Sequence, residues 1–247
     1  MLFVRHAGTP GMRTACFPAP EQADRAGLAR AALLAGTADL ARTTAYAGPP
    51  APEPEDGNPG TTHPGKATGR RAADPRLGGS GVRGIVAAGQ AGAAFVAPSV
   101  AALQTAAAMG LAPIVVDALA EADFGRWSGR PYAEVAQEEP DALASWLADP
   151  EAAPYGGESL ARMSARVTGW LDETAARFDG RRGRPLLVIC DAGAIRAALG
   201  HALGLAPPQA ARIDLAPLST TELAATRGGW RVAHVNRVAH ELRKATS

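Results

Sequence analysis

The sequence lacks the features that mark a secreted, membrane-bound or metal-binding protein. It has two cysteines in 247 residues, Cys16 and Cys190, too few for a disulfide framework and suited to a reducing compartment. No apolar run approaches the length of a membrane span, and the N-terminus lacks the basic and long apolar regions of a signal peptide. Neither a C-x-x-C nor a His-x-x-x-His spacing occurs. We therefore expect a cytoplasmic protein that needs no metal ion or other cofactor.

An excess of charge of either sign is also missing. Lys and Arg number 25 and Asp and Glu 24, for a formal net charge of +1. This balance argues against nucleic acid or an anionic membrane as the main partner. Hydrophobic residues make up 47% of the chain, so it can bury a substantial core. The sequence does not define the oligomeric state, and a homodimer is one possibility.

One segment has little that could be buried. Close to half of residues 48–84 are Gly or Pro, with Pro49, Pro50, Pro52 and Pro54 in close succession. Such a composition cannot bury enough apolar surface to offset the entropy lost on ordering the chain. We expect a disordered insertion within a single domain that covers residues 1–247.

The remaining chain alternates between strand and helix patterns. Short apolar runs predict strands at the N-terminus and at 93–97, 114–116 and 185–190, followed by a hairpin of 220–225 and 230–235. Helical spacing predicts helices at 21–36, 100–109, 131–148 with a break near Pro140, from 159 onward, and 194–203. This alternation predicts an α/β fold, a three-layer sandwich with a mostly parallel central sheet.

The first strand runs directly into Arg5 and His6, followed by a small Ala-Gly turn. Open α/β sheets bind ligands at the carboxyl ends of their strands, so this pair would lie where a ligand binds. Arg5 is a fixed cation, and His6 carries an imidazole that can act as nucleophile or base. Taken alone, the pair could equally be two solvated polar residues at a strand end.

Further segments agree with one family. They are Arg5-His6-Ala7-Gly8, Gln104-Thr105-Ala106, Glu121-Ala122-Asp123-Phe124-Gly125-Arg126-Trp127-Ser128-Gly129, Gly157-Glu158-Ser159 and Cys190-Asp191-Ala192-Gly193-Ala194-Ile195-Arg196. In content and order they resemble the motifs of the histidine phosphatase superfamily, which has the phosphoglycerate mutase-like fold. The resemblance implies that fold for nearly the whole chain outside the Pro- and Gly-rich segment.

The resemblance also implies roles for individual residues. In the family, a histidine carries the phosphoryl group, two arginines and a second histidine hold the phosphate oxygens, and a glutamate protonates the leaving group. Arg5 matches the first arginine, His6 the nucleophile and Glu121 the proton donor. The second arginine falls on Ala101 and the second histidine on Asp191.

These two differences weaken the expectation of a phosphatase. A carboxylate about 4 Å from one phosphate charge costs roughly 4 kcal/mol at an effective dielectric constant near 20. Loss of a guanidinium removes about 1.5 to 3 kcal/mol more. A cation from Arg13 or Arg196 could soften this loss.

The sequence therefore favours a repurposed small-molecule acid–base enzyme that uses His6, Asp191 and Glu121 for proton transfer, elimination, cyclisation or hydrolysis. Two alternatives remain: a weak or narrow phosphomonoesterase with a phospho-His6 intermediate, and a non-catalytic binding or scaffold protein.

Four more side chains are expected to contact the substrate. They are Arg5, Thr9, Arg13 and Trp127. For Trp127 the alternative is a place in the core. A metal ion held by His6, Asp191 and Glu121 is disfavoured because Arg5 would lie beside it.

Overall fold

The computed structural model describes residues 1–35, 93–178 and 186–238. Along the chain, the elements at the centre of the fold are β1 (Leu2–Arg5), α2 (Arg25–Ala35), β2 (Ala93–Val96), α4 (Val100–Ala108), β3 (Ile114–Val115), α7 (Leu160–Arg177), β4 (Leu186–Cys190), α8 (Ala192–Leu203), β5 (Ser219–Thr226) and β6 (Gly229–Val238). Shorter helical segments join them: α1 (Pro10–Arg13), η1 (Asp117–Leu119), η2 (Gly125–Trp127), α5 (Tyr132–Glu138), α6 (Pro140–Ala148) and α9 (Pro207–Ala210).

The strands form one mixed sheet with the order β3-β2-β4-β1-β5-β6. The first four of these run parallel, and β5 and β6 are antiparallel to their neighbours. Every residue of β4 is buried, as expected for a parallel strand covered on both faces. Its partners are β2 on one side and β1 on the other, with Arg5 opposite Cys190.

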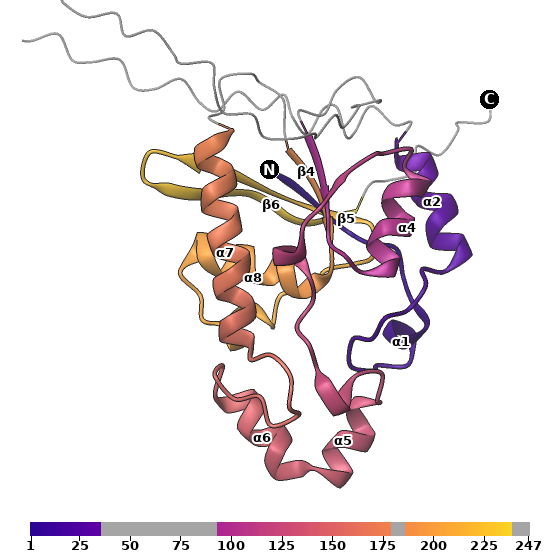
Figure 1. The fold of residues 1–247 in the computed structure, drawn as a ribbon, viewed down its shortest axis with the longest axis vertical. Helices are drawn as coiled ribbons and strands as arrows, with labels where there is room; N and C mark the ends of the chain where they lie inside the picture. The colour runs from indigo at the N-terminus through magenta and orange to yellow at the C-terminus, as the bar shows by residue number, and fades with distance from the viewer. Residues whose placement is uncertain (36–92, 179–185, 239–247) are drawn as a thin grey trace, which may run out of the picture.

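Helices cover both faces of the sheet. Figure 1 shows α7 and α8 on one side and α2 and α4 on the other. The side of α7 that packs inward carries Met163, Val167 and Leu171, at the spacing of an amphipathic helix. Ser159 caps this helix by accepting a hydrogen bond from the Arg162 amide at 3.2 Å. The predicted α/β three-layer fold is therefore confirmed.

Element boundaries differ from expectation in a few places. Helix α2 begins at Arg25 instead of residue 21, because Glu21 instead accepts hydrogen bonds from the Gly11 amide. Helix α8 begins at Ala192 instead of residue 194, with only Asp191 between it and β4. The predicted insertion at 48–84 lies outside the described residues. Within the described ranges, none of the helices has the length and apolar character needed to cross a bilayer.

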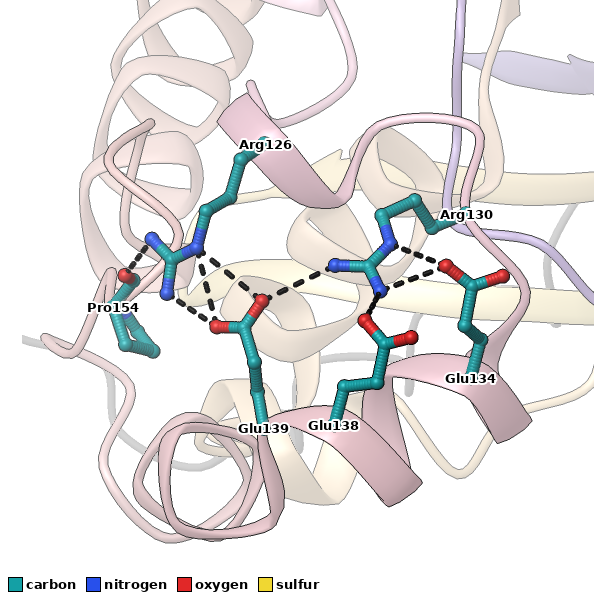
Figure 2. Close-up of polar contacts among 6 residues, drawn as sticks. All are labelled: Arg126, Arg130, Glu134, Glu138, Glu139 and Pro154. Carbon is teal, nitrogen blue, oxygen red and sulfur yellow. Dashed lines mark hydrogen bonds and ion pairs between the residues drawn. The ribbon is translucent and has the colours of Figure 1, made fainter.

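Helices α5 and α6 form an extension away from the sheet, at the bottom of Figure 1. Two arginines tie this extension to the turn η2. Arg126 and Arg130 both donate to Glu139, from Nε at 3.1 Å and from Nη1 at 3.2 Å respectively (Figure 2). Arg130 also pairs with Glu134 and Glu138 on α5. The network fixes the junction of α5 and α6 relative to the segment that follows Glu121.

Candidate active site

The parallel strands end together at one edge of the sheet, and this edge positions the first pair of polar residues. The His6 amide donates to the Cys190 carbonyl at 3.1 Å, which continues the pairing of β1 with β4 by one residue. His6 and Asp191 therefore leave adjacent strands side by side. His6 Nε2 lies 3.0 Å from Asp191 Oδ1, and both residues are buried.

The hydrogen bonds of His6 fix where its protons can be. Nδ1 lies 2.7 Å from the Ala7 carbonyl oxygen, which can only accept, so Nδ1 carries a proton. Nε2 and Asp191 Oδ1 then need one proton between them to form their own hydrogen bond. The other carboxylate oxygen of Asp191 accepts from Ser99 Oγ at 2.9 Å. The contact between Nε2 and Oδ1 is therefore a hydrogen bond with one proton between the two atoms.

Glu121 approaches the same edge from the segment between η1 and η2. Its Oε2 accepts from the Gly193 amide at 2.9 Å and its Oε1 from the Ala122 amide at 3.0 Å. Burial, together with the negative charge of Asp191, raises the pKa of Glu121. A Cβ on Gly193 would lie 1.9 Å from Oε1, so glycine at this position makes room for the carboxyl group.

Two arginines supply positive charge. Burial and the nearby charge of Arg196 lower the pKa of Arg5, whose guanidinium donates to the Leu215 carbonyl and, at 3.3 Å, to the sulfur of Met12. Arg196 on α8 donates from Nε to the Ile213 carbonyl at 3.0 Å. Arg13 is paired instead with Asp24 at 3.1 Å. A bound anion would offset both the burial and the mutual repulsion of Arg5 and Arg196.

These groups line one cavity of about 650 Å³. Its wall includes Arg5, His6, Glu121, Asp191, Arg196 and Ser99, and the expected contacts Thr9 and Arg13 lie in it as well. Ala101, on α4, also faces this cavity. Within the described ranges, no group of three or more His, Cys, Asp or Glu residues is arranged to hold a metal ion. The arrangement suits proton transfer next to an anion.

A model of the histidine phosphatase superfamily (branch 1) matches residues 65–238, more than half of the chain. The chain belongs to the histidine phosphatase superfamily. The match does not include Arg5 and His6, which the structure nevertheless brings to Asp191 and to the cavity that Glu121 lines.

Similar proteins include a bifunctional protein and a phosphatase. A bifunctional protein of Mycobacterium tuberculosis is 33% identical over 141 residues, which cover 56% of this chain and 38% of that protein. Phosphoserine phosphatase 1 of Hydrogenobacter thermophilus is 39% identical over 77 residues, 31% of this chain and 36% of the enzyme. The chain thus matches well under half the length of these relatives.

The fold is shared with solved phosphatases. A mycobacterial glucosyl-3-phosphoglycerate phosphatase superposes with a TM-score of 0.66 at 19% identity, over 96% of this chain and 98% of that one. This likeness shows the fold alone. Together with the family match, the comparisons support the phosphatase alternative better than the repurposed acid–base enzyme that the sequence favoured.

Trp127 does not line the cavity that contains His6 and Asp191. Its side chain is fully buried, with ring centroids 4.9 Å from Tyr155 and 5.1 Å from Phe17. This corrects the expectation that Trp127 contacts the substrate. Aromatic residues favour such clusters in a core, so its burial follows from packing.

The sequence gave no role to Ser99, which lines the cavity, or to the Gly193 amide, which holds Glu121, whereas it left Tyr132 either in a pocket wall or in the core. Ser99 precedes helix α4 and could have been found as a typical N-cap residue, although it uses its hydroxyl on Asp191. Gly193 belongs to the motif of residues 190–196, but the motif alone does not indicate that its amide binds Glu121. Tyr132 lines the cavity, and burial and Glu121 raise the pKa of its phenol.

Proposed function

We propose that the protein is a phosphomonoesterase that forms a phospho-His6 intermediate, with Asp191 bearing a proton while phosphate is bound. The observation that carries this proposal is the hydrogen-bond pattern of His6. With Nδ1–H donating to Ala7, the proton shared with Asp191 can move to the carboxyl and leave a lone pair on Nε2. Nε2 is then a nucleophile, and Asp191 is a neutral donor to a phosphate oxygen.

Protonation of Asp191 removes the main electrostatic objection to phosphate binding. The carboxylate would repel one phosphate charge by roughly 4 kcal/mol at 4 Å, whereas a hydrogen bond to a charged oxygen contributes about 1.5 to 3 kcal/mol. Arg5 and Arg196 supply cations at the same cavity. Helix α8 begins at Ala192, and helix N-termini favour anions.

The proposed reaction has two steps, transfer of the phosphoryl group to His6 and hydrolysis of the phosphohistidine. Nε2 of His6 attacks phosphorus, the bond to the ester oxygen breaks, and Glu121 gives its proton to the departing alkoxide. Water then attacks the phosphohistidine, the N–P bond breaks, and the Glu121 carboxylate takes the proton of the water. Inorganic phosphate leaves, and both residues return to their starting states.

The raised pKa of Glu121 predicts a pH dependence. Rates with alkyl phosphates should fall as pH rises through this pKa, because the carboxylate cannot protonate the leaving group. Asp191→Asn removes a charge that raises the pKa of Glu121, so the alkaline limb should move to lower pH. The measurement is kcat/KM against pH for both proteins. A nitrophenyl phosphate serves as the control, because its leaving group departs as a phenolate without taking a proton. If the rate falls equally at alkaline pH for the alkyl and nitrophenyl esters, Glu121 is not the general acid.

The close approach of Gly193 and Glu121 gives a further expectation. Gly193→Ala should displace the Glu121 carboxyl group and lower kcat for alkyl phosphates by about 100-fold or more, the usual contribution of a general acid. Gly169→Ala is the matched control, because Gly169 is exposed within α7 with no atom near the added Cβ. It should retain activity and gain about 0.5 to 1 kcal/mol of stability. Equal kcat values in the two variants would argue against this placement of the acid.

The experiment that tests the proposed function is chemical trapping. The enzyme is mixed with a phosphomonoester, quenched in alkali, which preserves phosphohistidine, and digested for mass spectrometry. The phosphoryl group should be found on the peptide that contains His6. If phosphate is released but no phosphohistidine is found at any quench time, water attacks the ester directly and the proposed intermediate is wrong.

A second candidate is the acid–base enzyme, favoured by the direct contact of Asp191 with His6. In that case His6 would abstract a proton from carbon or oxygen and pass it to Asp191. Exchange of solvent deuterium into a substrate, without phosphate release from any ester, would identify this function.

A further inference from the structure

A second cavity lies beside the first one, among helices α7, α8 and α9. It has a volume of about 530 Å³, which is within the range of small-molecule sites. Apolar side chains dominate its wall, among them Phe124, Trp146, Leu160, Met163 and Leu205. Glu121 and Arg196 also lie in this wall.

The two cavities adjoin at Glu121. Pro18, Glu121, Tyr132 and Arg196 line both of them. The Glu121 carboxyl is fixed in this partition by the amides of Gly193 and Ala122. An alcohol oxygen that takes a proton from Glu121 must contact this carboxyl, so the rest of the alcohol begins at the boundary between the cavities.

The two cavities differ in chemistry away from this boundary. The first cavity continues along Arg13, Glu21, Asp24 and Arg30, which are charged. The second continues along the apolar side chains of α7 and the residues after α8. A charged alcohol would find partners of opposite charge in the first cavity. An apolar ring would be shielded from water by apolar side chains in the second cavity.

We propose that the second cavity binds the alcohol half of the substrate, and that this alcohol is uncharged, largely apolar and of the size of one or two rings. The proposal rests on the proposed function, since it needs the phosphate in the first cavity next to His6. It assigns α7 a role in substrate specificity through Ser164 and Ala165, which face the second cavity.

The experiment compares 1-naphthyl phosphate with glycerol 3-phosphate as substrates. Ser164→Phe places a ring in the second cavity and should lower the ratio of their kcat/KM values at least tenfold. Ala165→Phe is a second filling variant at an exposed position, where a larger side chain does not disturb the core. Ala176→Phe is the matched control, because Ala176 is exposed on the same helix and does not line the cavity. It should keep the wild-type ratio.

Binding of 1-naphthol alone, measured by calorimetry, separates this proposal from the proposed function. Wild type and Ala176→Phe should bind it, and Ser164→Phe and Ala165→Phe should bind at least tenfold more weakly. If no ester is hydrolysed but this pattern of binding is found, the phosphatase function fails and the apolar subsite stands. If esters are hydrolysed with the same ratio in all variants, or if 1-naphthol binds all variants equally, the subsite is wrong.

Discussion

Replacing His6 with alanine should lower kcat for phosphomonoesters at least about 1,000-fold, the scale of losing a nucleophile that acts together with its partners. The reason is geometric as well as chemical. Nε2 of His6 is the atom next to Asp191, and Nδ1 is held by the Ala7 carbonyl, so alanine removes the proposed nucleophile together with its hydrogen bond to Asp191. Phosphoryl transfer to His6 would be lost with it.

The measurement is steady-state release of phosphate, with circular dichroism to show that the variant is folded. His234→Ala is the matched control: its imidazole also lies near a carboxylate, 3.6 Å from Glu222, but it belongs to β6 and lines neither cavity. It should keep wild-type kcat. A His6→Ala protein with more than a tenth of the wild-type kcat would place the nucleophile elsewhere.

The variant that combines Asp191→His with Ala101→Arg should hydrolyse phosphomonoesters faster than the wild type. These are the two positions where the family pattern has cationic or donor residues, and Ala101 and Asp191 both line the cavity. Each new charge-assisted hydrogen bond is worth about 1.5 to 3 kcal/mol, or roughly 10- to 150-fold in rate.

Each single change should help less than the pair, because a phosphate dianion needs both neutralisation and a closed set of donors. The measurement is kcat/KM for an aryl phosphate in the wild type, both single variants and the double variant. Adding His6→Ala to the double variant should abolish the gain. A folded double variant no faster than the wild type would mean that Asp191 and Ala101 do not face the bound phosphate.

The local pattern of the sequence determined the order of the elements. The apolar runs of β1 and β4 and the stripe of α7 follow from side-chain periodicity, which is set by residues close together in the chain. The pairing of parallel strands then brings their carboxyl ends to one edge. For this reason Arg5, His6 and Asp191 could be assigned to a single site before their distances were known.

Only the tertiary structure decided how these groups interact. The contact of His6 Nε2 with Asp191, and of Glu121 with the Gly193 amide, joins residues far apart in sequence, and no local pattern encodes such distances. The same holds for Trp127, whose motif position suggested a ligand contact but whose ring is enclosed by neighbouring aromatics. Strand patterns therefore placed Arg5, His6 and Asp191 at one edge of the sheet, whereas side-chain packing determined that Ser99 joins them, that Trp127 does not, and which atoms meet.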